Sequence, residues 1–211
     1  MNAIFDIDCR RCARLAAFLD AVKLEEPSYY CRPVPPFGDR KARIVMVGLA
    51  PGMHGANRTG RPFTGDHAGI LLYQTLFKFG LATQPTSVAA DDGLRLLDAR
   101  ITNSVKCLPP QNKPLPSEVR QCNSFLRAEI EASAEARVFL ALGAIAHAAV
   151  LRAFDLHLSQ FPFAHAAQHE LGQGRVLLDS YHCSRYNTST KVLTVPMFKK
   201  VVGRACELAG L

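Results

Sequence analysis

The sequence predicts an α/β fold: a three-layer α/β/α arrangement around a four-stranded parallel sheet. Short apolar runs rich in β-branched residues alternate about four times with amphipathic segments of helical length. Helices on both faces of a parallel sheet follow from such alternation. Three stretches rich in polar residues, glycine or proline, 48–66, 102–113 and 180–187, each follow a predicted strand. We therefore expect these three stretches to meet at one edge of the sheet, where α/β proteins bind ligands.

The elements can be placed in order along the chain. The predicted strands are 43–47, 100–105, 138–142 and 175–178, and the predicted helices are 68–79, 117–135, 144–154 and 193–208. An irregular crossing over 24–40 precedes the first strand, and a polar excursion over 82–97 separates the first helix from the second strand. Pro196 is tolerable because it falls in the first turn of the last helix.

Composition sets the class of protein. The 211 residues are 48% apolar and 20% charged, which predicts one globular domain over 1–211. No apolar run reaches membrane-spanning length, and the first residues do not resemble a signal peptide, so we expect a cytoplasmic protein with no membrane partner. The net charge of +7 favours a polyanionic partner such as nucleic acid.

The stretch from Gly48 to Asp66 is the most informative. It contains five glycines and two prolines directly after an apolar strand, but neither a phosphate-binding Gly-Lys-Ser/Thr nor a Gly-x-Gly-x-x-Gly fingerprint. Arg58 and Arg61 indicate an anion nearby, Phe63 offers a flat apolar face, and Asp66 ends the stretch with a carboxylate. The alternative is an ordered surface loop in which Asp66 caps the next helix; capping and catalysis are not exclusive.

Four cysteines form the first of two further groups of residues that favour a binding site. They are Cys9 and Cys12, at a Cys-x-x-Cys spacing, together with Cys107 and Cys122. This set suits an iron–sulfur cluster better than a zinc ribbon, because a zinc ribbon needs a second Cys-x-x-Cys. Buried free cysteines remain the alternative.

Cys31, Cys183 and Cys206 are left over as core or surface thiols. Phe63, Asn103 and His182 together would suit a planar heterocycle, by stacking and by hydrogen bonding to its edge. Singly, they could be a core residue, a turn former and a satisfied polar residue.

The motifs resemble those of uracil-DNA glycosylases, most closely the iron–sulfur family 5, or type b, over roughly residues 9–205. The likeness is carried by Gly48-Leu49-Ala50-Pro51-Gly52, the stretch 55–66, Thr102-Asn103, Val105-Lys106-Cys107, Pro109-Pro110, Asn112-Lys113-Pro114, Ser180-Tyr181-His182, Ser184-Arg185 and Asn187. Leu49 stands where family 4 has an acidic residue, and the first loop lacks the water-activating residues of other branches.

The resemblance implies the four-stranded α/β/α fold and a role for each motif. A 4Fe-4S cluster would be held by Cys9, Cys12, Cys107 and Cys122. Asp66 would activate water and His182 would face the base carbonyl that gains charge, while Phe63 stacks on a flipped base and Asn103 reads its edge. Substrate contacts would also come from Gly48, Ala50, Gly52, Ser184 and Arg185.

Two positions depart from the family pattern, Cys183 in place of a proline and Ala68 in place of a small hydroxyl residue. The first could loosen the loop that enters the minor groove. Candidates for phosphate contacts are Arg58, Arg61, Lys106, Lys113 and Arg185, each of which could equally be a solvated surface charge.

The resulting hypothesis is a monofunctional repair glycosylase, monomeric by default, that leaves an abasic site in DNA. It would remove uracil and other deaminated bases such as hypoxanthine and xanthine, and no lysine is placed for strand cleavage. The rival hypothesis is a non-catalytic iron–sulfur sensor of nucleic acid on the same fold. A hydrolase of free nucleotides is disfavoured by the missing phosphate-binding lysine motif.

Overall fold

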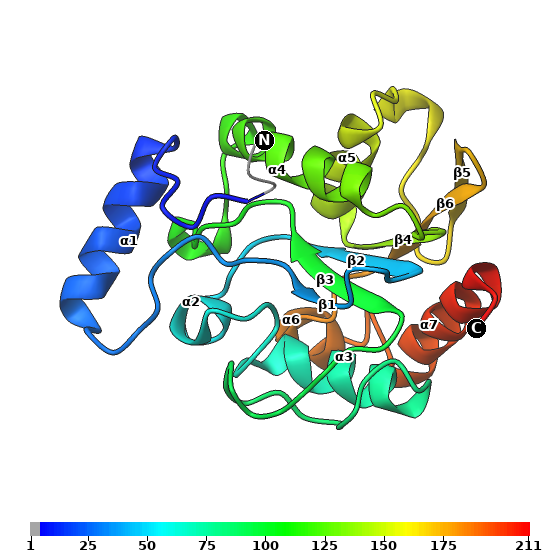
Figure 1. The fold of residues 1–211 in the computed structure, drawn as a ribbon, viewed down its shortest axis with the longest axis horizontal. Helices are drawn as coiled ribbons and strands as arrows, with labels where there is room; N and C mark the ends of the chain where they lie inside the picture. The colour runs from blue at the N-terminus through cyan, green and yellow to red at the C-terminus, as the bar shows by residue number, and fades with distance from the viewer. Residues whose placement is uncertain (1–4) are drawn as a thin grey trace.

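A central sheet of six strands organises the computed structural model, which describes residues 5–211 (Figure 1). The strands are β1 (Phe37–Gly38), β2 (Ile44–Gly48), β3 (Ala99–Asn103), β4 (Val138–Leu142), β5 (Gln168–Gly172) and β6 (Arg175–Ser180). Their order is β1-β3-β2-β4-β6-β5, and the four central strands are parallel. The predicted four-stranded parallel sheet is therefore confirmed, with an antiparallel strand added at each edge.

Helices cover both faces of the sheet. They are α1 (Ala13–Glu25), α2 (Ala56–Thr59), α3 (His67–Lys78), α4 (Pro116–Ala132), α5 (Ala144–Ala153), α6 (Arg185–Ser189) and α7 (Val195–Ala209). Two short 3-10 helices lie at Pro110–Asn112 and Leu158–Gln160. In Figure 1, α3 and α7 lie below the sheet and α4 and α5 above it, which gives the three predicted layers.

The alternation of side chains along the strands builds a core on each face. On β2, Ile44 and Met46 pack toward α3 and α7, whereas Val45 and Val47 pack toward α4 and α5. All five residues of β2 and of β4 are buried, as expected for central strands covered on both sides.

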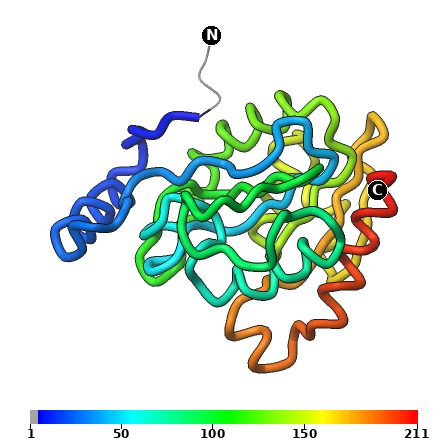
Figure 2. The backbone as a smooth tube through the Cα atoms, turned by 60° about the horizontal axis from the view of Figure 1, so that its bottom comes forward, coloured from blue at the N-terminus to red at the C-terminus, as the bar shows by residue number. Residues whose placement is uncertain are grey.

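A third apolar cluster lies at one end of the molecule. It joins the buried side of α1, including Leu15 and Leu19, to Val105 and Leu108 after β3 and to Phe125 on α4. Figures 1 and 2 both place α1 at this end and α7 at the opposite end. The segment between β3 and α4 is therefore held against the N-terminal segment.

The structure adds elements that the hydrophobic pattern did not predict. The irregular crossing ends in β1, and Ala82 and Leu96 form an isolated bridge that closes the polar excursion. Strand β5 escaped prediction because three of its five residues are exposed. Across the described residues, no helix combines the length and the apolar character needed to cross a membrane.

Candidate active site

One pocket lies at the carboxyl edge of the parallel strands, where the loops after β2, β3 and β6 meet. Its volume is about 360 Å³, and its lining residues are Leu49, Ala50, Gly52, Ala56, Phe63, Asp66, Ala68, Asn103, Asn112, His182 and Ser184. The predicted convergence of three post-strand stretches at one edge is therefore confirmed. Every base-contacting or catalytic side chain proposed from the sequence, Phe63, Asp66, Asn103 and His182, contributes to this one pocket.

Asp66 is both a helix cap and a pocket residue. Its Oδ1 accepts a hydrogen bond from the backbone N–H of Gly69 at 3.1 Å, which caps α3. Its Oδ2 lies over the backbone of Gly55, where an added Cβ would be only 2.3 Å away. Burial raises the pKa of Asp66, against the opposing effect of hydrogen bonds from the backbone of Gly69 and Ala68. One carboxylate oxygen is thus fixed by the helix while the other faces the glycine loop.

Phe63 and His182 form the stacked wall of the pocket. Their ring centroids are 5.9 Å apart and the ring planes are inclined by 29°. Phe63 is buried and has a φ of 54°, a left-handed conformation that a bulky residue rarely adopts. Gly48 makes room for the ring, because a Cβ there would lie 2.7 Å from Phe63 and 2.5 Å from Asn103 Oδ1.

Asn103 supplies the amide group of the pocket. It is the last residue of β3, paired in register with Gly48 at the end of β2. Its side chain is 3% exposed, and within residues 5–211 its Oδ1 has no hydrogen-bond partner. An unpaired buried amide oxygen costs about 1–3 kcal/mol, which a ligand that donates a hydrogen bond would recover.

His182 enters the pocket as a neutral imidazole. Desolvation lowers its pKa to about 4, so it is uncharged at neutral pH. Its backbone carbonyl accepts a hydrogen bond of 2.9 Å from Asn187 Nδ2, which holds the loop that carries it. A neutral imidazole can still donate one hydrogen bond to an acceptor in the pocket.

The residues that follow His182 have distinct positions. Cys183 is fully buried and packs into the core between the sheet and α3 and α7. Ser184 lines the pocket and caps α6 by accepting from the backbone N–H of Asn187 at 3.3 Å. Arg185, the first residue of α6, is exposed and lies outside the pocket lining.

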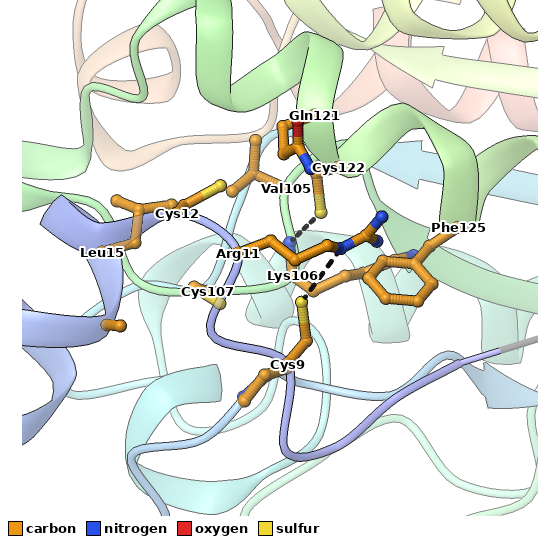
Figure 3. Close-up of a pocket in the computed structure, with 12 residues that line it drawn as sticks. Cys9, Arg11, Cys12, Leu15, Val105, Lys106, Cys107, Gln121, Cys122 and Phe125 are labelled. Atoms are coloured by element: carbon orange, nitrogen blue, oxygen red, sulfur yellow. Dashed lines mark hydrogen bonds between the residues drawn. The ribbon is translucent and has the colours of Figure 1, made fainter. Parts of the chain in front are cut away.

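Four cysteines line a second pocket, between the N-terminal segment and α4 (Figure 3). Cys9 and Cys12 precede α1, Cys107 follows β3, and Cys122 lies on α4. Two hydrogen bonds to sulfur are drawn in Figure 3. Arg11 Nε donates to Cys9 Sγ at 3.4 Å, and the backbone N–H of Lys106 donates to Cys122 Sγ at 3.3 Å.

The spacing of the sulfur atoms bears on what this cysteine pocket can hold. Within residues 5–211, no three of these sulfur atoms lie within 4.8 Å of one another. A single zinc ion with Zn–S bonds of about 2.3 Å would require sulfur atoms about 3.8 Å apart. Burial also raises the pKa of Cys107 to about 12, so without a metal this thiol would be protonated at neutral pH. The four sulfur atoms therefore lack the spacing of a single zinc site.

With this geometry in view, the comparisons with known proteins are decisive. Residues 35–205 match the uracil DNA glycosylase superfamily. The chain belongs to this superfamily. It is 49% identical over 208 residues to a type-5 uracil-DNA glycosylase of Thermus thermophilus, an alignment that covers 96% of this chain and 94% of that protein. A type-5 enzyme of Pyrobaculum aerophilum is 42% identical, with 97% and 90% covered.

Type-4 relatives within the superfamily match over less of the chain. A type-4 uracil-DNA glycosylase of Archaeoglobus fulgidus is 34% identical over 163 residues, which cover 77% of this chain and 68% of that protein. The predicted resemblance to the type-5 branch, rather than to type 4, is confirmed by the higher identity and coverage of the type-5 relatives.

Two predicted phosphate contacts of this glycosylase-superfamily chain are wrong. Arg61 is buried, pairs with Asp92 at 2.6 Å, and has its guanidinium 4.8 Å from the centroid of the Phe37 ring. Lys106 is 1% exposed and pairs with Glu129 at 2.8 Å. Both cations are neutralised by carboxylates distant in the sequence, so neither is a solvated charge or a phosphate contact.

The positions of the other three predicted cations are consistent with phosphate contacts. Arg58, Lys113 and Arg185 are exposed. The sequence alone assigned no individual role to Ala56 or Asn112, which line the pocket at the carboxyl edge of the sheet. It also assigned none to Gly55, which lies under Asp66. All three fall inside the motifs already quoted, but Ala56 has no polar group that could have marked it as a pocket residue.

Proposed function

We propose that this protein hydrolyses the bond between uracil and deoxyribose in DNA and leaves an abasic site. The observation that carries the proposal is a single pocket that combines a stacked aromatic wall, a buried unpaired amide oxygen, a carboxylate and a neutral imidazole. These are the groups needed to bind a planar base and to stabilise both products of glycosidic cleavage. Membership of the superfamily supports the same reaction.

Recognition of the base is assigned to Phe63 and Asn103. The edge of uracil presents an N–H between two carbonyl oxygens, so a carboxamide can accept from the N–H and donate to one carbonyl. The base must leave the duplex to enter a pocket of this kind, at a cost of a few kcal/mol. Stacking on an aromatic ring returns about 1–3 kcal/mol of that cost.

Cleavage is assigned to Asp66 and His182. As the glycosidic bond breaks, its electron pair leaves with the base, and the sugar becomes an oxocarbenium-like cation. The Asp66 carboxylate stabilises this cation and orients a water molecule, whose oxygen bonds to the sugar carbon while its proton passes to the carboxylate. His182 donates a hydrogen bond to the carbonyl of the departing base, where negative charge develops.

DNA binding is assigned to the exposed cations and to the overall positive charge. Phosphate contacts are assigned to Arg58, Lys113 and Arg185 because they are exposed, and the net charge of +7 favours association with DNA at low salt. We extend the substrate range to hypoxanthine and xanthine, because residues 48–55, the first part of the glycine-rich stretch, hold no acidic or amide side chain that would restrict the enzyme to one base. No lysine lines the pocket, so no strand-cleaving step is included.

The four cysteines of the second pocket are assigned to a 4Fe-4S cluster. The meeting of all four cysteines in one pocket and the two N–H groups that point at sulfur support this assignment. When bound, the cluster would tie the N-terminal segment to the β3–α4 connection and α4. Its structural role is sufficient for the proposed reaction, which uses only residues of the base pocket.

The cluster assignment predicts that Cys107→Ser loses iron, whereas Cys31→Ser retains it. Cys31 is a matched control, since it is buried in the same apolar cluster but does not line the cysteine pocket. Iron and acid-labile sulfide would be measured on anaerobically purified protein. Equal iron content in the two variants would contradict the assignment. So would a wild-type protein that contains no iron although the four thiols of the pocket are intact.

The activity is tested with oligonucleotides that hold one uracil or one hypoxanthine. We expect alkali-labile sites from the wild type on both, and a loss of about 10- to 100-fold in the rate for Asn103→Ala, since its amide contacts each contribute about 1–3 kcal/mol. Thr83→Ala, which lies outside the pocket, should behave as wild type. Tight DNA binding without abasic sites would instead favour the non-catalytic sensor.

A further inference from the structure

Three titratable side chains lie together between α5 and the sheet, apart from both pockets described above. His147 lies on α5, His169 on the edge strand β5, and Asp179 on β6. One ligating atom from each lies within 4.8 Å of the others. Asp179 and His147 are buried, and His169 is partly exposed. None of the three lines the base pocket or the cysteine pocket.

The sheet register explains why these residues meet. On β6, Leu177 packs toward α5, so Asp179, two residues later, faces the same side of the sheet. His169 is the register partner of Leu177 on β5 and therefore shares that face. The helix that covers this face presents His147 to both strands.

The hydrogen-bond partners of His147 call for a cation beside it. Its Nε2 lies 2.9 Å from the carbonyl oxygen of Phe161, which can only accept, so Nε2 carries a hydrogen. Its Nδ1 lies 2.9 Å from Asp179 Oδ1. In a neutral imidazole this second nitrogen carries a lone pair in place of a hydrogen. That lone pair would face a carboxylate oxygen, and the two would repel each other. Either a second proton shared by these two atoms or a metal ion bound to the imidazole lone pair must therefore offset their repulsion.

A second pair of atoms favours the metal ion over the proton. Asp179 Oδ2 and His169 Nε2 are buried and, within the described residues, have no hydrogen-bond partner. They are 3.4 Å apart. Bonds of about 2.0–2.1 Å from zinc to nitrogen and oxygen, at a tetrahedral angle, place two ligand atoms about 3.3–3.4 Å apart. The unsatisfied pair thus has the separation of two ligands to one ion.

We propose that His147, His169 and Asp179 bind a divalent transition-metal ion of the zinc class. The bond from His147 Nε2 to the Phe161 carbonyl is the outer contact that orients a metal-binding imidazole. The rings of Phe161 and Phe163 pack edge-on against His169 and His147, with centroids 5.7 and 5.6 Å apart, and partly cover the two imidazoles. The partly exposed edge of His169 leaves a path for the ion, which ties α5 to β5 and β6.

The test uses cluster-loaded protein that has been passed over a chelating resin and then incubated with a slight excess of Zn²⁺. Keeping the proposed cluster in place removes its four cysteines as competing ligands. Bound zinc is counted by elemental analysis, and Tm is measured with and without the ion. A parallel sample with ¹¹³Cd²⁺ reports the ligand type, because the cadmium chemical shift separates nitrogen and oxygen ligands from sulfur ligands.

The variants are His169→Gln, Asp179→Asn and, as a control, the exposed His157→Gln. We expect one zinc ion per chain, a nitrogen/oxygen cadmium shift and a higher Tm in the wild type and in His157→Gln, all lost in His169→Gln. His169→Gln keeps the test valid if Asp179→Asn fails to fold, because His169 lies on an edge strand and is partly exposed. No bound zinc in the wild type, equal zinc in His169→Gln, or a sulfur-type shift would overturn the proposal and leave a shared proton at this cluster.

Discussion

Asp66→Asn should reduce the rate of uracil excision by about 100- to 10,000-fold, the range typical of a lost general base. The amide cannot take a proton from water or balance the positive sugar. It can still accept the hydrogen bond from Gly69, and asparagine caps helices about as well as aspartate. Since burial raises the pKa of Asp66 and disfavours its charge, Tm at neutral pH should be unchanged or slightly higher. Single-turnover excision rates and thermal unfolding measure the two effects separately.

Two further variants control for position and for stability. Gly55→Ala places a Cβ 2.3 Å from Asp66 Oδ2 and should displace the carboxylate, so it should lose activity in the same direction. Thr194→Ala removes the cap of α7, outside the pocket, and should cost stability of about 0.5–2 kcal/mol with activity unchanged. Full activity in Asp66→Asn would assign the residue to capping alone.

The same carboxylate sets an expected pH dependence. The raised pKa of Asp66 means that the carboxylate takes up its proton at a pH above the ordinary value of 3.8. The activity that depends on the charged form should therefore be present at neutral pH and fall as the pH drops through that raised pKa. In Asp66→Asn the residual activity should lack this acid limb.

The central sheet could be predicted from the sequence because its signals are local. Continuous apolar runs mark β2 and β4, and the polar stretches directly after the strands mark the edge where the pocket forms. The family motifs then identified the side chains that meet there. Strand β5 gave no such signal, since a mostly exposed edge strand is defined by its pairing with β6.

The parts that could not be predicted depend on partners far away in the chain. Arg61 and Lys106 are buried only because Asp92 and Glu129 neutralise them, and neither pairing has a spacing that the sequence reveals. The cluster of His147, His169 and Asp179 likewise exists only once α5 covers β5 and β6. The position of Gly55 under Asp66 depends on how the glycine-rich loop folds back on α3.

His182→Ala should lower the rate of uracil excision by about 100- to 1,000-fold, the usual cost of one preorganised hydrogen-bond donor. Because its pKa is lowered to about 4, the imidazole is neutral across the working range and acts by donating a hydrogen bond rather than by its charge. The rate enhancement that His182 provides should therefore be larger for a base whose anion is less stable by itself. His157→Ala, at an exposed position, is the matched control.

Leaving-group dependence separates this role from a purely structural one. In 5-fluorouracil the electron-withdrawing fluorine stabilises the departing anion, so the substrate depends less on a donor from the protein. The ratio of wild-type to His182→Ala rates should then be clearly smaller for 5-fluorouracil than for uracil in the same oligonucleotide. A loss of equal size on both substrates would mean that His182 supports the Phe63 ring, 5.9 Å away, and that the base leaves without its help.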